Sequence, residues 1–378
     1  MQVRGRCYMT ETGKEYQAPN QPPSLGVIIV NYNYGRFVAD AIESVLNQNE
    51  AFDEIVVVDD GSTDRSLQVI EAYQPRVRVI SKENGGQLSA CLAGLAAIKT
   101  DYIYILDADD YVSPGFVGIA KAHLAERPAK VQFQLIGVDG QKNPLGSTFP
   151  TYPKGYGAMQ MVQDNRVIGF YLCPPTSGNI YRRDVITEMK FHLINLREPV
   201  DGSPTLAIPY LGAVKSVNKP VGYYRLHGQN HSRWDNPDVS LLQFEIDWFH
   251  RRWVDVCNLL DLDRPPFDGD EPLYVLERRL MQSALTPGAR VAGRALLYLR
   301  RLQAAHLLRR QKMILMAWAV AIALPFAKWR RKLVFARRSA RHRPLVFKRL
   351  MGLLTNSQSS VLAAKLESEP PSAVGSFK

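Results

Sequence analysis

Paired carboxylates at short spacing are the strongest chemical signal in the sequence. Asp107 and Asp109 are separated by one residue and directly follow the apolar run 102–106. Two carboxylates at a strand end can share a hard divalent cation, which prefers oxygen ligands and keeps coordination sites open for substrate phosphates. Such an ion would also stabilise the charge that develops on a leaving diphosphate. The pattern predicts an Mg²⁺ or Mn²⁺ site, with an acidic turn or helix cap at Asp110 as the alternative.

Polar residues follow other apolar runs in the same way. Asp60 comes after residues 55–58 and could accept hydrogen bonds from a base, while Tyr32 offers a flat ring for that base to stack on. Lys82 and the turn at Asn84 provide a cation and open backbone N–H groups for phosphate or ribose. Ordinary turn chemistry explains each cluster alone. Turn chemistry does not readily explain why all of these clusters occur at the same edge of one sheet, because crowded acidic groups repel one another unless a cation or a donor-rich ligand offsets their charge.

The elements that must position these residues follow an alternating pattern. Apolar runs lie at residues 25–30, 55–58, 77–80 and 102–106, and helical patterns lie at 37–46, 67–73 and 88–98. This order predicts an α/β fold with a mostly parallel sheet between helices. Ligands of such sheets bind beyond the carboxyl ends of the strands, where the polar clusters fall. The sequence has neither GxGxxG after the first run nor GxxxxGK[ST], which argues against a dinucleotide-binding enzyme and a P-loop enzyme.

Three segments within residues 27–110 closely resemble the family 2 glycosyltransferases. They read VIIVNYNYGRFVADAIESVLNQ, EIVVVDDGSTDRSLQVI and KENGGQLSACLAGLAAIKTDYIYILDADD. The resemblance implies a GT-A fold, a nucleotide-diphosphate-sugar donor, a divalent metal and inversion at the anomeric carbon. It implies that Tyr32 stacks on the base, that Asp60 binds it, and that Asp107 and Asp109 hold ribose and metal. We assign Val30 to the same nucleotide-sugar site.

One position departs from the family pattern. Relatives often read SAxNAG where residues 89–94 read SACLAG, so Leu92 stands in place of an asparagine. Any donor contact assigned to that asparagine is therefore in question here.

The second half of the chain should supply a base that takes the proton from the acceptor hydroxyl. Residues 176–183 resemble an acceptor-side segment of the family, and residues 219–232 resemble its YRxHxxN end. In that arrangement the aspartate before the apolar stretch is the base, which maps to Asp201. A helix cap at Asp201 and a base at Glu198 are the alternatives. His227 is assigned as a further metal ligand or a cation near the diphosphate, with an ordinary hydrogen-bonded histidine as the alternative.

Charge divides the chain near residue 278. Residues 1–277 hold 26 Lys and Arg against 34 Asp and Glu, a net charge of −8, whereas residues 278–366 hold 20 Lys and Arg and no acid. The acidic body and the shortage of aromatics among the cations argue against nucleic acid as a partner. We expect a polar, disordered leader at 1–24, a GT-A domain at 25–240 with halves 25–112 and 113–240, a helical, basic, membrane-associating extension at 241–356, and a disordered tail at 357–378.

Residues 313–327 form an uncharged stretch between basic clusters. As one helix they would span about 22 Å, short of a ~30 Å hydrocarbon core. The stretch is therefore expected to lie in or on an anionic lipid surface, with packing against the acidic body as the alternative. Residues 1–24 lack a secretory signal, and four dispersed cysteines suit a reducing compartment. The expected location is cytoplasmic, peripheral at the inner face of the cytoplasmic membrane.

These patterns predict an inverting, metal-dependent glycosyltransferase that moves a sugar from a nucleotide-diphosphate donor to a hydroxyl of a glycan or lipid-linked acceptor. The alternative is a non-catalytic nucleotide-sugar-binding or scaffold protein of the same fold at the membrane, which metal-dependent donor hydrolysis would distinguish. A phosphatase of the haloacid-dehalogenase type also uses DxD. That class has Thr or Val two residues after the second aspartate, where this chain has Tyr111.

Overall fold

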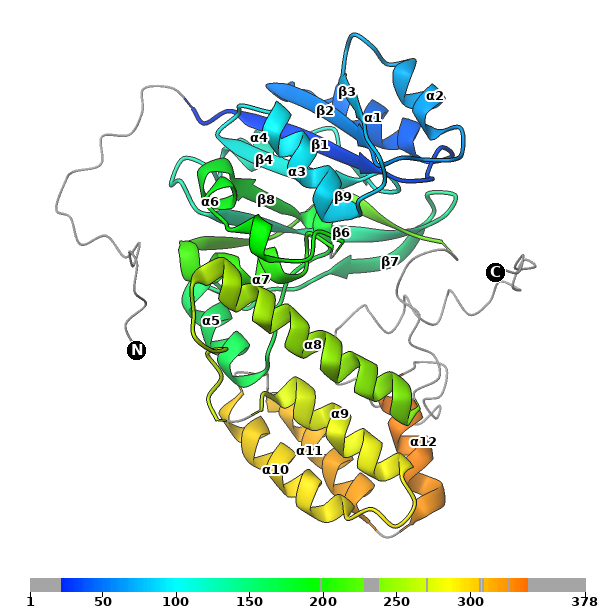
Figure 1. Ribbon diagram of the computed structural model, residues 1–378, viewed down its shortest axis with the longest axis vertical. Coiled ribbons are helices and arrows are strands. Elements are labelled where there is room, and N and C mark those ends of the chain that lie inside the picture. The colour runs from blue at the N-terminus through cyan, green and yellow to red at the C-terminus, as the bar shows by residue number, and fades with distance from the viewer. Residues whose placement is uncertain are drawn as a thin grey trace, which may run out of the picture.

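The computed structural model describes residues 22–197, 199–227, 238–269, 271–305, 307, 309–324 and 326–338. The centre of the fold is a nine-stranded sheet of order β3-β2-β1-β4-β8-β6-β9-β5, with β7 paired to β6. Its strands are β1 (Leu25–Asn31), β2 (Glu54–Asp59), β3 (Arg78–Ser81), β4 (Tyr102–Asp107), β5 (Tyr111–Val112), β6 (Lys130–Asp139), β7 (Pro144–Phe149), β8 (Asn179–Arg182) and β9 (Val214–Leu226). The sheet occupies the upper half of Figure 1.

The first half of the sheet is parallel, as predicted. β1 pairs in parallel with β2 and β4, and β2 pairs in parallel with β3. Beyond β4 the sheet is mixed: β8 is antiparallel to both β4 and β6, while β6 and β9 run parallel to each other. The carboxyl ends of β1, β2 and β4 therefore meet at one edge, which brings the predicted polar clusters together.

Helices cover both faces of the parallel half. Every residue of β1 is buried, because alternate side chains of a central strand point to opposite, covered faces. Val27 and Ile29 pack with α1 (Val38–Leu46), and Ile28 packs with α3 (Gln87–Ala97). The remaining helices of this part are α2 (Ser66–Glu71), α4 (Phe116–Lys121), α5 (Ala158–Val167), α6 (Arg183–Thr187), α7 (Ser203–Leu211) and the short 3₁₀ turns η1 (Thr176–Gly178) and η2 (Phe191–Leu193).

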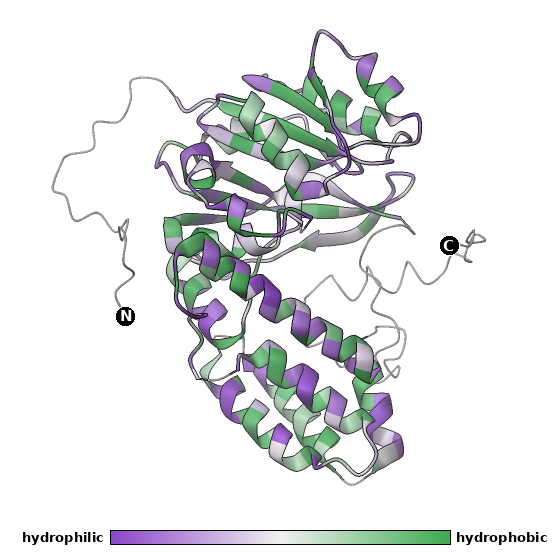
Figure 2. Ribbon diagram, in the orientation of Figure 1, coloured by the Kyte–Doolittle hydropathy of each residue, from purple (hydrophilic) through white to green (hydrophobic). Residues whose placement is uncertain are grey.

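The C-terminal helices form a second layer below the sheet (Figure 1). They are α8 (Val239–Leu260), α9 (Leu273–Leu285), α10 (Val291–Ala304), α11 (Arg309–Ala323) and α12 (Ala327–Arg338). Phe249 and Trp253 of α8 belong to the core beside the sheet, whereas Tyr298 and Trp318 belong to a separate core among α9–α12. Figure 2 shows strongly hydrophobic central strands and helices that carry both hydrophobic and hydrophilic residues in this lower layer.

Helix α11 contains most of the uncharged stretch predicted at 313–327. Trp318, Ala319 and Ile322 are buried in the lower core. Three apolar side chains on the other side of the helix are exposed, namely Met313, Met316 and Val320, and Leu324 just beyond its C-terminal end is exposed as well. Among the described residues, no helix is both long and apolar enough to cross a membrane. The predicted leader, except residues 22–24, and the predicted tail lie outside the described residues.

Candidate active site

Three carboxylates gather where β4 ends. Asp107, Asp109 and Asp110 each offer an oxygen within 4.8 Å of the others. His227, at the end of β9, places Nε2 2.9 Å from Asp109 Oδ2, and the rings of Tyr34 and Phe37 lie 5.5 and 5.0 Å from its imidazole. The predicted metal residues Asp109 and His227 are therefore brought together. Asp110, for which the sequence suggests only a turn or a helix cap, joins them.

The electrostatics of this acidic cluster fit a divalent cation. Burial, Asp109 and Asp201 raise the pKa of Asp107 well above its ordinary value. Burial, Asp109 and Asp107 do the same to the pKa of Asp110, and Asp110 Oδ2 has no hydrogen-bond partner within the described part of the chain. Like charges at this distance oppose joint ionisation, and a hard cation bound to their oxygens would remove that cost.

Asp60 organises the turn that follows β3. Its carboxylate is 2% exposed and accepts hydrogen bonds from the N–H groups of Gly85 at 3.0 Å and Gly86 at 2.8 Å. Lys82 Nζ lies 2.7 Å from the same carboxylate, and Asn84 Nδ2 donates to the Asp60 carbonyl at 3.0 Å. The structure thus joins three residues that we assigned to nucleotide-sugar binding, Asp60, Lys82 and Asn84, into one unit.

Besides Asp107, two further residues assigned to the donor, Val30 and Tyr32, lie at the end of β1. Val30 is buried, and its carbonyl accepts from the N–H of Ala108 at 3.1 Å, which ties β1 to the acidic cluster. The side chain of Tyr32 is 46% exposed just beyond the strand. An exposed ring at this edge is accessible for stacking on a base.

Arg225 is a site residue that our sequence reasoning missed. It is 2% exposed, and its guanidinium lies 4.5 Å from the Phe37 ring centroid and 5.4 Å from that of Tyr111. It pairs with Asp40 at 2.8 Å, and its backbone N–H donates to Asp110 Oδ1 at 2.8 Å. Arg225 therefore fixes the end of β9, two residues before His227. Its place in the YRxH segment was the available signal.

Asp201 lies in a turn before α7. The turn is closed by a hydrogen bond from the N–H of Gly202 to the carbonyl of Pro199 at 3.0 Å, and we call residues 199–202 the Asp201 turn. The N-cap residue of α7 is Gly202, so the alternative of Asp201 as that cap is wrong. Asp201 is half-buried, and its effect on Asp107 places it within electrostatic reach of the acidic cluster. Glu198 lies outside the described residues.

The acceptor-side segment at 176–183 also reaches the cluster. Ser177 Oγ accepts from the backbone N–H of Asp107 at 3.2 Å, and the Ser177 carbonyl accepts from Tyr104 OH at 2.7 Å. The segment thus supports the end of β4 from the side of the sheet where β8 begins.

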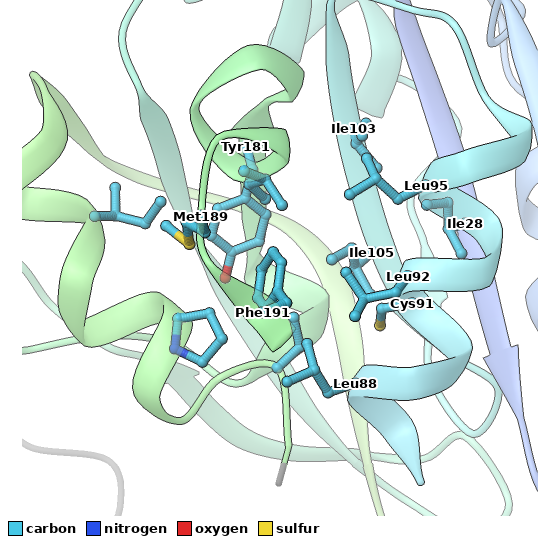
Figure 3. A pocket seen from close by; sticks show the side chains of 14 residues that line it. Ile28, Leu88, Cys91, Leu92, Leu95, Ile103, Ile105, Tyr181, Met189 and Phe191 are labelled. Atoms are coloured by element: carbon cyan, nitrogen blue, oxygen red, sulfur yellow. The ribbon is translucent and has the colours of Figure 1, made fainter. Parts of the chain in front are cut away.

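An apolar pocket separates α3 from the segment that leads to the Asp201 turn (Figure 3). Leu88 and Leu92 line it from α3, and Met189, Phe191 and Val200 line it from the opposite side. Leu92 therefore contributes to an apolar wall. An asparagine here would place an amide among apolar side chains, at a cost unless it found partners, which accounts for the departure from the family pattern.

Comparisons with known proteins lead to one enzyme family. Residues 26–189 match the model of glycosyl transferase family 2. An uncharacterized glycosyltransferase of Nostoc sp. is 34% identical over 215 residues, which cover 55% of this chain and 66% of that protein. Hyaluronan synthase of Pasteurella multocida is 30% identical over 223 residues, which cover 56% of this chain and 21% of the synthase.

The crystal structure of TarS 1–349 from S. aureus aligns with 83% of this chain and 91% of its own, at 18% identity and a TM-score of 0.47. The chain spans less than two thirds of the length of the curated relatives named above. The family match, the identities to glycosyltransferases and the α/β sheet with its acidic edge lead to one assignment. The chain belongs to glycosyltransferase family 2.

Proposed function

We propose that this protein transfers a sugar from a nucleoside-diphosphate donor to a hydroxyl of a glycan or lipid-linked acceptor, with inversion at the anomeric carbon. One observation carries the proposal: a cluster of three buried and half-buried carboxylates suited to a cation, with Asp201 within electrostatic reach of it. The cluster has the chemistry to hold a diphosphate through a cation. A separate carboxylate has the chemistry to act as a base.

In the proposed reaction the acceptor oxygen attacks the anomeric carbon from the face opposite the diphosphate. Asp201 takes the hydroxyl proton as the new C–O bond forms, and the diphosphate leaves with the electrons of the broken bond. Asp109 and His227, with Asp107 and Asp110, would hold Mg²⁺ or Mn²⁺, which when bound offsets charge on the leaving group. In the same proposal Tyr32 stacks on the base, while Val30, Asp60, Lys82, Asn84 and Asp107 bind the nucleotide sugar.

The acceptor side of the proposal places the enzyme in polysaccharide biosynthesis at a membrane surface. The relative from P. multocida is a hyaluronan synthase, which supports a growing glycan as acceptor. Helix α11 is apolar on two sides, one buried in the lower core and one exposed. Basic residues lie at the start of α11, at Arg309, and beyond its end, at Lys328 of α12. An exposed apolar face between cations suits an anionic lipid surface.

A screen of nucleotide sugars tests the proposal directly. The full chain should hydrolyse or transfer sugar from one donor when Mn²⁺ or Mg²⁺ is present, and the released nucleoside diphosphate can be measured. Excess chelator and Asp109→Ala should both abolish the signal. Donor binding without turnover in every acceptor mixture would favour the scaffold alternative instead.

A further inference from the structure

Gln87, the first residue of α3, contacts both halves of the site. Its Nε2 donates to Asp107 Oδ1 at 2.5 Å, and its Oε1 accepts from the backbone N–H of Val200 at 3.1 Å. The orientation of the amide follows from its partners, because a backbone N–H must meet the oxygen and a carboxylate must meet the NH₂ group. One side chain therefore joins the acidic cluster to the residue that precedes Asp201.

The Asp201 turn has a second polar anchor at the same residue. The carbonyl of Val200 accepts from Thr205 Oγ1 at 3.0 Å, and Thr205 Oγ1 lies 2.9 Å from Tyr181 OH of β8. Both backbone polar groups of Val200 are thus bonded, one toward the acidic cluster through Gln87 and one toward the sheet. Buried backbone groups need such partners, so loss of either would leave one unsatisfied.

The turn lies beside an apolar pocket and close to the start of α3. Val200 is one of the residues that line the apolar pocket, so side-chain packing beside it is incomplete. Beside Gln87, a Cβ on Gly86 would lie 2.9 Å from Arg197 Cα, and Gly86 has φ +91°. A glycine with this conformation permits the close approach of the two segments, which brings Gln87 within reach of Val200.

We propose that Gln87 is a positioning residue that sets the place of the Asp201 carboxylate relative to the donor-binding acidic cluster. It acts through the Val200 N–H and does not itself exchange a proton. The inference rests on the proposed function, because it assumes that Asp201 is the base of the transfer reaction. A small displacement of a catalytic group costs rate out of proportion to its size.

A double-mutant cycle tests the proposal on the full chain. Gln87→Met keeps the length of the side chain and removes both hydrogen bonds. It should lower kcat for transfer by about 10- to 100-fold, with the Kd for the donor changed less than about threefold. In an Asp201→Asn background the same substitution should cost less than about threefold, because residues that act as a unit are not additive. Gln87→Glu keeps only the acceptor for the Val200 N–H, and its kcat for transfer should also be lower than that of the wild type.

Gln48→Met is the matched control. Gln48 is another half-buried glutamine that joins two segments, through Ser44 and Ser113. Any fold-decrease in kcat that Gln48→Met causes should be the same in the wild type and in the Asp201→Asn background. Three results would overturn the inference: wild-type kcat in Gln87→Met, a loss confined to donor binding or thermal stability, or full additivity with Asp201→Asn. An active Asp201→Asn enzyme would also overturn it, since the residue through which Gln87 acts would then be dispensable. Absence of turnover in the wild type would instead contradict the proposed function.

Discussion

His227 Nε2 lies 2.9 Å from Asp109 Oδ2, although 118 residues separate them in the chain. The contact joins the end of β9 to the acidic cluster at the end of β4. It places one imidazole nitrogen beside three carboxylates, at a strand end that the buried guanidinium of Arg225 also fixes. The first prediction tests this pair.

Asp109→Asn should remove metal-stimulated turnover almost completely. His227→Gln should weaken Mn²⁺ affinity by about 10- to 100-fold, as loss of a ligand or of a group that orients one commonly does. Metal titration of donor hydrolysis measures both effects. Asp184→Asn, at a carboxylate 57% exposed beside Arg182, is the control that should leave the titration unchanged. Equal metal response in His227→Gln and the wild type would limit His227 to packing.

Asp201→Asn should lower the rate of transfer by ~10²-fold or more, because the amide keeps the shape of the side chain and loses its basicity. Donor binding should persist, since the change lies on the acceptor side. Single-turnover transfer and calorimetric donor binding separate the two quantities. If Glu198→Gln were the damaging change and Asp201→Asn were not, the role of base would move to Glu198.

The metal-free protein should lose stability as the pH rises above the ordinary range of an aspartate, about pH 4. Burial and neighbouring acids raise the pKa of Asp107 and Asp110, so the folded state holds protons that the unfolded chain has released, and raising the pH then favours unfolding. Mn²⁺ competes with those protons and should raise Tm more at pH 7.5 than at pH 5. Thermal scans with and without Mn²⁺ test this, and Asp110→Asn should flatten the pH dependence. An equal Mn²⁺ shift at both pH values would contradict it.

The exposed face of α11 should bind anionic vesicles. Val320→Gln should weaken cosedimentation of the full chain, whereas Val254→Gln on α8 should not, although the two valines are 53% and 56% exposed. High salt should loosen binding without abolishing it, because screening acts on charges and leaves the apolar term. Full release by salt would show that charge alone binds the protein to the vesicles and that the apolar face of α11 contributes nothing. If the full-length chain stays in the supernatant when anionic vesicles are pelleted, the proposed membrane association is wrong.

Arg338→Met should lower the free energy of unfolding by about 1–3 kcal/mol, because it removes two hydrogen bonds of a buried carboxylate and leaves Arg278 as the remaining cation beside it. That carboxylate is Glu245 of α8, 1% exposed, whose Oε2 accepts from Arg338 Nη1 at 2.6 Å. Urea unfolding measures the loss. Lys328→Met, at an exposed position of the same helix, should change stability little, and equal effects would show that the ion pair contributes no more than a surface charge.

Residues at strand ends could be predicted from the sequence because local pattern and sheet topology determine their place. Asp60, Asp107 and Asp109 follow short apolar runs, and parallel pairing brings such positions to one edge. Gln87 and Arg225 could not be found in this way. Their partners, Val200 and Asp40, are 113 and 185 residues distant, and only the complete fold brings them within hydrogen-bond range. The sequence also could not show which side of α11 is buried, because a uniformly apolar stretch has no periodicity that distinguishes a covered side from an exposed one.

Glu245 and Glu277 also reduce the effective charge that residues 278–366, the basic tail, present at a distance. Arg278, Arg337 and Arg338 pair with these two acids, and although burial opposes it, Arg337 and Arg278 lower the pKa of Glu277. These three cations act as internal counterions, so the formal charge of the tail overstates the field that reaches an approaching surface. Buried pairs are screened far less than exposed charges, and salt should therefore weaken binding to a surface before it loosens the helices. Cutting the chain at residue 277, where its composition changes, would divide α9 and strand both acids without counterions.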